Sequence, residues 1–162
     1  MTHPVPIDDA AELTRYIETR YHARHRAHLP QLVLLAEMVE DLHTGDEGNP
    51  QGLSGILRGL SVGLDARMKE EASVLFPAIR KAAVSGAGDP IAVLRADRAG
   101  HAREIALVRK ITKDLTLPDA ACTSWATLYA GLKGFIDDLT THLWLVNDIL
   151  LVQFGVRDPV HG

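Results

Sequence analysis

Histidine is the residue type through which this sequence could most readily do chemistry. Eight histidines occur in 162 residues, and the neutral imidazole ring is a common ligand of metal ions. Cysteine occurs once, at Cys122, which excludes an internal disulfide bond and a zinc or iron–sulfur site built from the cysteines of one chain. No glycine-rich phosphate loop, nucleophile elbow or Ser–His–Asp spacing is present. These patterns favour a binding protein and give no support to a group-transfer enzyme.

The spacing of the polar residues limits which of them can share one site. His22 and His43 fall on the same predicted helix, 21 residues apart, which corresponds to about 30 Å at the helical rise per residue. A straight helix therefore keeps these two histidines from one metal centre. Arg67 and Glu71 are four residues apart, on one face of a helix, where they can form an ion pair.

Long amphipathic segments must position these side chains. Apolar residues recur at helical spacing in four stretches, and we expect each stretch to be a helix. The first three helices cover residues 8–43, 50–84 and 90–113, and the fourth runs from a cap at 116–119 to residue 152. Pro30 predicts a kink or a local break in the first helix. No segment alternates with a period of two residues. The sequence predicts an all-α, up-down-up-down four-helix bundle, a single domain over residues 1–162 with its core at about 8–153.

Composition and charge restrict the partners and the compartment. The formal net charge is −4 and the pI is near 6.0, without the basic stripe that binding to nucleic acid or to a membrane surface requires. No apolar run approaches the roughly 20 residues that span a bilayer, and residues 1–9 do not resemble a signal peptide. We therefore expect a cytoplasmic protein with neither a nucleic-acid nor a membrane partner.

Several phrases stand in a characteristic order between residues 10 and 152. They are Arg20-Tyr21-His22 with His25 and Leu29-Pro30, Met68-Lys69-Glu70-Glu71 with Leu75-Phe76-Pro77, Pro90-Ile91, Ala121-Cys122 with Trp125, Tyr129-Ala130-Gly131-Leu132, and Asp137-Asp138-Leu139 before His142. Together they resemble the hemerythrin-like domain of the repair-of-iron-centres family. The resemblance implies a four-helix bundle that holds two irons through four histidines and two bridging glutamates. It also implies a role in nitrosative or oxidative stress, commonly described as the restoration of damaged iron–sulfur clusters.

Three of the six ligand positions implied by this resemblance are kept. His22 matches the histidine of the first helix, Glu71 matches the first bridging glutamate, and His142 matches the histidine of the fourth helix. These three residues are the metal ligands that the resemblance predicts for this chain.

The other three ligand positions depart from the family pattern. Arg67 replaces the second helix's histidine, Arg98 replaces the third helix's histidine, and Val146 replaces the second bridging glutamate. His25 and His101 each lie about one helical turn from a ligand position, but neither restores a carboxylate bridge.

The substitutions matter most through their charge. Arg67 and Arg98 add two positive charges that cannot be removed by deprotonation. At about 4 Å and an effective dielectric constant of about 20, each repulsion between unit charges costs about 4 kcal/mol. We therefore do not expect a di-iron centre. The first hypothesis is one non-haem iron, held by His22, Glu71 and His142 as a two-histidine, one-carboxylate set. It leaves an open position for a diatomic ligand such as nitric oxide or oxygen.

A second hypothesis is a haem-binding bundle. Either His22 or His142, or both, would be axial ligands, and Arg67 or Arg98 would contact a propionate. The haem would occupy a slot beside a stripe of glycines that recurs at three- and four-residue spacing, namely Gly52, Gly55, Gly59 and Gly63.

A third hypothesis, from a different class, is a metal-free interaction protein. Arg67 and Arg98 would fill the volume that the metals vacate, paired with Glu71 and Asp97, because buried charges are costly unless paired. The two arginines could alternatively form an anion clamp. The glycine stripe would permit close helix packing, either within the bundle, in a homodimer or with a di-iron homologue. Cys122 is expected to be a buried, inert thiol.

Overall fold

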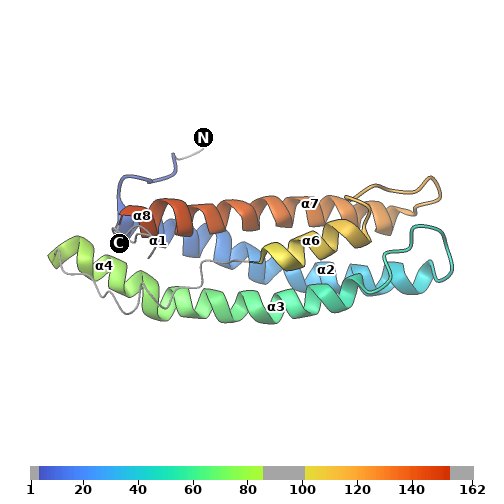
Figure 1. The fold of residues 1–162 in the computed structure, drawn as a ribbon, viewed down its shortest axis with the longest axis horizontal. Coiled ribbons are helices and arrows are strands. Elements are labelled where there is room, and N and C mark those ends of the chain that lie inside the picture. The colour runs from blue at the N-terminus through green and yellow to red at the C-terminus, as the bar shows by residue number, and fades with distance from the viewer. Residues whose placement is uncertain (1–3, 86–100, 154–162) are drawn as a thin grey trace. The chain divides into compact units, whose positions relative to one another are not determined.

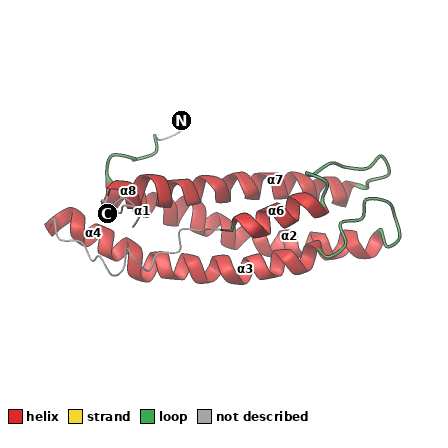
Figure 2. Cartoon of the chain, viewed as in Figure 1, coloured by secondary structure: helices red, strands yellow, loops and turns green. Residues whose placement is uncertain are grey.

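A computed structural model describes residues 4–85 and 101–153 of the chain. Every regular element within these ranges is a helix, and no strand occurs in them, as Figures 1 and 2 show. The described part of the chain therefore confirms the all-α class that the hydrophobic periodicity predicts. None of the described helices combines the length and the hydropathy of a membrane-spanning segment.

The helices follow one another in nearly continuous stretches. The first stretch consists of α1 (Ala10–Ile17), the π-helix η1 (Glu18–His22) and α2 (Ala23–Leu42). The second consists of α3 (Leu53–Glu70), the π-helix η2 (Glu71–Leu75) and α4 (Phe76–Ser85). The described part of the third is α6 (Ala102–Ile111), and the fourth consists of α7 (Thr123–Trp144), the π-helix η3 (Leu145–Leu150) and α8 (Leu151–Gln153).

Two predicted helix boundaries require correction. Of the two outcomes predicted for Pro30, a kink or a local break, the break does not occur, because α2 continues through this exposed residue. The fourth helix begins at Thr123, later than the expected cap at 116–119. In the loop that follows α6, Lys113, Asp114 and Leu115 all have positive φ angles, of 51°, 57° and 59°. This left-handed backbone ends the helical path, and the chain stays irregular up to Cys122.

Contacts between Cα atoms divide the chain into two compact units, and each is described by itself. The first unit comprises residues 1–24, 66–100 and 139–162. Its described core contains large apolar side chains, namely Leu13, Ile17, Tyr21, Leu75, Phe76, Ile79, Leu145, Val146, Leu150 and Leu151. Arg80 ties α4 to the N-terminal helix, because its guanidinium donates to Thr14 Oγ1 at 2.9 Å and to Glu18 Oε1 at 2.6 Å.

The second unit comprises residues 25–65 and 101–138. Its core is also apolar and includes the buried side chains Leu29, Leu32, Leu53, Leu57, Leu60, Val108, Trp125, Leu128, Leu132 and Phe135. Glu40 caps α3, because its carboxylate accepts the Ser54 backbone N–H at 2.7 Å and the Ser54 hydroxyl at 3.0 Å. An anion at this position satisfies a helix N–H that has no partner within the helix.

Candidate metal centre

Three residues from different helical stretches of the first unit converge on one point. His22 ends η1, Glu71 begins η2, and His142 lies in α7 shortly before η3. The exposed fractions of the three residues are 1%, 3% and 0%. One potential ligand atom from each lies within 4.8 Å of the others. The structure therefore brings together the three residues that the resemblance predicts as ligands.

A single oxygen of Glu71 is shared by the two imidazole rings. Oε1 lies 2.7 Å from His22 Nε2 and 2.7 Å from His142 Nε2. An ionised carboxylate can only accept hydrogen bonds, so each Nε2 carries the hydrogen that it donates in this arrangement. The Nε2 atoms of His22 and His142 therefore point at Glu71 Oε1, the carboxylate oxygen that would bind the same metal ion.

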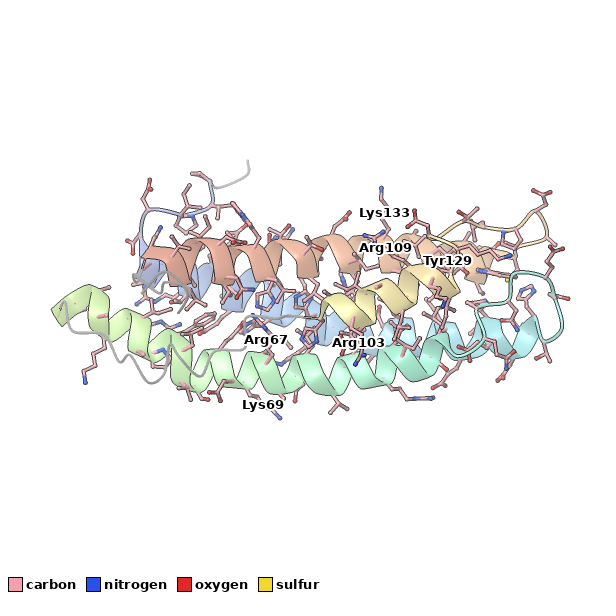
Figure 3. The ribbon with its side chains drawn as sticks, viewed as in Figure 1. Arg67, Lys69, Arg103, Arg109, Tyr129 and Lys133 are labelled. Atoms are coloured by element: carbon pink, nitrogen blue, oxygen red, sulfur yellow. The ribbon has the colours of Figure 1, made fainter. Side chains whose placement is uncertain are left out.

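The second oxygen of the same carboxylate bonds a cation. Arg67 Nε donates to Glu71 Oε2 at 3.1 Å, and the Arg67 and Glu71 side chains are 7% and 4% exposed. The Nη2 group of Arg67 lies 3.5 Å from the side-chain oxygen of Asn147. Figure 3 shows the Arg67 and Lys69 side chains leaving α3 on opposite sides, and Lys69 is exposed. Arg67 thus belongs to the buried face of α3.

The pKa of Glu71 is set by two opposing effects. Burial by itself would raise this pKa, since it removes water from the charged form. The hydrogen bonds from His142 and His22, together with the charges of His142 and Arg67, outweigh burial and lower the pKa to about 2. Glu71 is therefore a carboxylate at neutral pH, which is the form that binds a metal ion.

Apolar and aromatic side chains surround the polar cluster. The ring of Phe76 stacks on His22 at 5.7 Å between centroids, and the ring of Tyr21 stacks on His142 at 6.2 Å. Val146, at the position predicted to have lost a glutamate, is 1% exposed and belongs to the apolar core of this unit. The charges therefore lie in a water-poor environment, where their mutual interactions are strong.

Each candidate ligand lies in or next to a π-helical segment. η1 ends at His22, η2 starts at Glu71, and η3 starts three residues after His142. A π-helical turn inserts an extra residue into an α-helix and is frequent at functional sites. These turns have no signal in the sequence, since no glycine or proline marks the segments Glu18–His22, Glu71–Leu75 and Leu145–Leu150.

The remaining residues of the sequence-based hypotheses are not part of this cluster as far as the structure describes them. Arg98 and Asp97 lie outside the described residues. His25 belongs to the second unit and contacts the Phe135 ring at 5.4 Å, edge to face. His101 belongs to the same unit, where its ring lies 3.5 Å from the position that a Cβ atom would take at Gly63.

Within the glycine stripe, Gly63 lies against the His101 side chain, whereas Gly55 and Gly59 do not have the predicted packing role within the described part of the bundle. Gly52 precedes α3 and has a φ angle of +92°, which is a conformation that favours glycine. Gly55 and Gly59 are exposed, and a Cβ atom at either would meet no described atom within 4 Å. These two glycines therefore make neither a close helix contact nor a buried slot with the described part of the chain.

The donor set suits a non-haem metal ion. Two imidazole nitrogens and one carboxylate oxygen form the two-histidine, one-carboxylate combination that binds iron(II) and leaves coordination positions open. For binding, each Nε2 must give up its hydrogen, which the other ring nitrogen can carry instead. The buried His22, Glu71 and His142 therefore fit the requirements of such an ion in residue type and in convergence.

Comparison with known proteins identifies the family. The model of the hemerythrin HHE cation binding domain matches residues 15–153. The chain belongs to this family, which confirms both the resemblance stated from the sequence and the expected four-helix-bundle class.

Curated relatives extend the match to particular proteins. The chain is 41% identical over 145 residues to the iron-sulfur cluster repair protein YtfE of Edwardsiella ictaluri. This alignment covers 90% of the chain and 64% of the relative. It is 39% identical over 139 residues to the protein of that name from Dickeya chrysanthemi, covering 86% of this chain and 63% of the relative. The chain thus spans somewhat less than two thirds of the length of these relatives.

Proposed function

We propose that this chain is an iron-binding protein of the stress response that holds one non-haem iron through His22, Glu71 and His142, where the family pattern implies two. The observation that carries the proposal is the contact of Arg67 with the second oxygen of Glu71. A carboxylate bridges two metal ions through its two oxygens. Here one oxygen faces the imidazoles and the other bonds a guanidinium.

Electrostatics supports a single ion. A second metal ion at Glu71 Oε2 would replace or approach the Arg67 guanidinium, which stays protonated at any ordinary pH. At about 4 Å and an effective dielectric constant of about 20, the repulsion is about 4 kcal/mol for each unit of charge on the ion. Val146, in the buried core, supplies no ligand to offset this cost.

The chain's own residues have distinct roles in this proposal. His22 and His142 would donate nitrogen lone pairs, and Glu71 would donate Oε1 and one negative charge. Arg67 keeps Glu71 ionised and fixes its orientation, while Phe76 and Tyr21 restrict access of water to the rings. Iron held in this way offers an open coordination position to a diatomic ligand such as nitric oxide or oxygen.

The names of the relatives suggest the setting. Proteins that are about 40% identical over most of this chain are called iron-sulfur cluster repair proteins. We propose that this chain acts in the same context, nitrosative or oxidative stress, as a binder of iron and a diatomic ligand. A group-transfer reaction is not part of the proposal.

Spectroscopy after loading separates the three functional hypotheses. Protein incubated anaerobically with iron(II) and then with nitric oxide is expected to give an electron paramagnetic resonance signal of iron–nitric oxide. That signal should be lost in His142→Ala. A Soret band after addition of haem would instead support the haem-binding hypothesis. Retention of neither iron nor haem would support the metal-free interaction protein and contradict our proposal.

A further inference from the structure

A second cluster of reactive side chains occurs in the second unit, where Cys122 contacts His43. The Cys122 sulfur lies 3.1 Å from His43 Nε2, and His43 Nδ1 lies 2.8 Å from the Asp46 carboxylate. The imidazole therefore stands between a thiol and a carboxylate. The same order of groups activates cysteine nucleophiles, because the carboxylate orients and stabilises the protonated ring.

The ends of two helices reinforce this charge distribution. His43 directly follows the last residue of α2, and its N–H bonds the Val39 carbonyl. Cys122 directly precedes α7, and its carbonyl accepts the first backbone hydrogen bond, from Ala126 at 3.1 Å. A helix C-terminus stabilises a cation and a helix N-terminus stabilises an anion. Both ends therefore favour an imidazolium beside a thiolate.

The direction of the pKa shifts agrees with this geometry. The hydrogen bond with His43 lowers the pKa of Cys122, and the backbone N–H groups of Trp125 and Ser124 lower it further. The hydrogen bonds with Cys122 and Asp46 raise the pKa of His43. Thiolate is the nucleophilic form of cysteine, so such a pair reacts at a lower pH than an isolated thiol.

The cluster borders a cavity large enough for a small molecule. The cavity is lined by Asp46 and Trp125 among other residues, and its volume is about 540 Å³. This volume lies in the usual range for small-ligand sites. Trp125 packs against the His43 ring, with 4.6 Å between the ring centroids. Cys122 is only half-buried, contrary to the expectation of a buried thiol.

We propose that Cys122 is a site of reversible S-thiolation, at which it exchanges with a low-molecular-weight disulfide of the glutathione type. The Cys122 thiolate attacks one sulfur of the small disulfide and forms a new S–S bond with it. The original S–S bond breaks, and the departing thiolate takes the proton of the His43 imidazolium. The neutral imidazole stays bonded to Asp46, and no other oxidant is consumed, because one disulfide is exchanged for another.

The presence of one cysteine makes the test unambiguous, since any adduct must lie on Cys122. The reduced full chain is mixed with glutathione disulfide at several pH values between about 5 and 9, and adduct formation is followed by intact-protein mass spectrometry. His43→Gln should slow the reaction at least about tenfold near pH 6.5 and move its pH midpoint upward, because the thiolate loses its cationic partner.

The controls separate this effect from changes in folding or in other charges. His28→Gln, an exposed histidine on α2, should react like the parent protein. The other ionisable groups that line the cavity are Glu47, Lys113 and Asp119, and their removal should change the midpoint less than His43→Gln does. Circular dichroism confirms that each variant is folded.

Two results would overturn the proposal. One is an unchanged rate and pH midpoint in folded His43→Gln. The other is a native chain that forms no adduct, or only a disulfide-linked dimer, while the urea-unfolded chain reacts normally.

Discussion

Arg67 and Glu71 form a buried ion pair one helical turn apart, with Nε 3.1 Å from Oε2. The two oxygens of the Glu71 carboxylate therefore have different partners, since Oε2 accepts a hydrogen bond from the guanidinium and Oε1 faces both imidazoles. Breaking a buried ion pair by removing one partner is costly, because the other charge stays behind. The pair therefore bears on stability and on metal affinity together, and the two effects can be measured separately.

The charge of Arg67 should weaken the binding of any cation at Glu71. Arg67→Met removes this charge with little loss of side-chain volume, so the affinity for iron(II) should rise at least about tenfold. The metal-free protein should become less stable by about 3 kcal/mol, since Glu71 loses its cationic partner. Competition with a chromophoric chelator measures the affinity, and urea unfolding measures the stability.

Lys69→Met provides the matched control, because Lys69 is an exposed cation on the same helix (Figure 3). Both quantities should change little in this variant. An iron affinity that stays constant or falls in Arg67→Met would contradict the claim that the Arg67 guanidinium repels a metal ion bound at Glu71.

The two histidines should be indispensable for iron binding. His22→Ala and His142→Ala each remove one of three ligands, and even outer-shell changes at metal sites commonly cost 10- to 100-fold in affinity. Each variant should therefore lose at least about 100-fold. His28→Ala, which changes an exposed histidine on α2, should bind as the parent does. Full iron binding by either buried-site variant, measured by equilibrium dialysis, would disprove the ligand assignment.

Glu71 should make the metal-free protein sensitive to acid in a defined window. Its pKa is about 2 in the folded protein against 4.5 for the ordinary carboxyl group. A folded-state pKa below the unfolded value stabilises the protein above pH 4.5, and this stabilisation, about 3 kcal/mol, is lost as the pH falls towards 2.

Urea unfolding of Glu71→Gln isolates this contribution. The stability difference between the parent and this variant should be largest near pH 7 and shrink below about pH 4.5. Glu70→Gln, at the adjacent exposed carboxylate, should keep the parent's pH dependence. A difference between parent and Glu71→Gln that does not depend on pH would show that Glu71 is not held ionised by its neighbours.

The exposed glycines of α3 should be replaceable in an isolated chain. Gly55→Ala and Gly59→Ala should each stabilise the protein by about 0.5–1 kcal/mol, since alanine is the better helix former and its Cβ meets no described atom within 4 Å. Gly131→Ala should gain less, because its Cβ would approach Leu32 Cδ2 to 2.7 Å.

Sedimentation at two protein concentrations, run beside the unfolding curves, tests the predicted homodimer through this stripe. A dimer weakened by Gly55→Ala or Gly59→Ala would assign the stripe to self-association. A loss of stability at a concentration where the chain is monomeric would contradict the view that these positions are free of contacts.

Helix positions were predictable from the sequence, whereas local departures from regular helix were not. Periodic apolar residues indicate which stretches are helical, because each helix must bury one face. The loop before α7 contains left-handed backbone at Lys113, Asp114 and Leu115. Of these residue types only aspartate favours that conformation, and lysine and leucine give no sign of it. The π-helical turns beside the candidate ligands were hidden for the same reason.

The two polar clusters differed in how far they could be foreseen. His22, Glu71 and His142 were found because their positions match a family pattern, and Arg67 was expected to pair with Glu71. The contact between His43 and Cys122 spans 79 residues and matches no spacing rule. One signal was available: in an up-down-up-down bundle, the end of the first helix and the start of the fourth lie at the same end.

The iron content of the loaded protein tests the central proposal most directly. The full chain, purified without a tag, is reconstituted anaerobically with excess iron(II), freed of loosely bound metal and analysed by inductively coupled plasma mass spectrometry. We predict one iron per chain, because Arg67 bonds the carboxylate oxygen that a second iron would need. Two irons per chain, both lost in Glu71→Gln, would contradict the proposal.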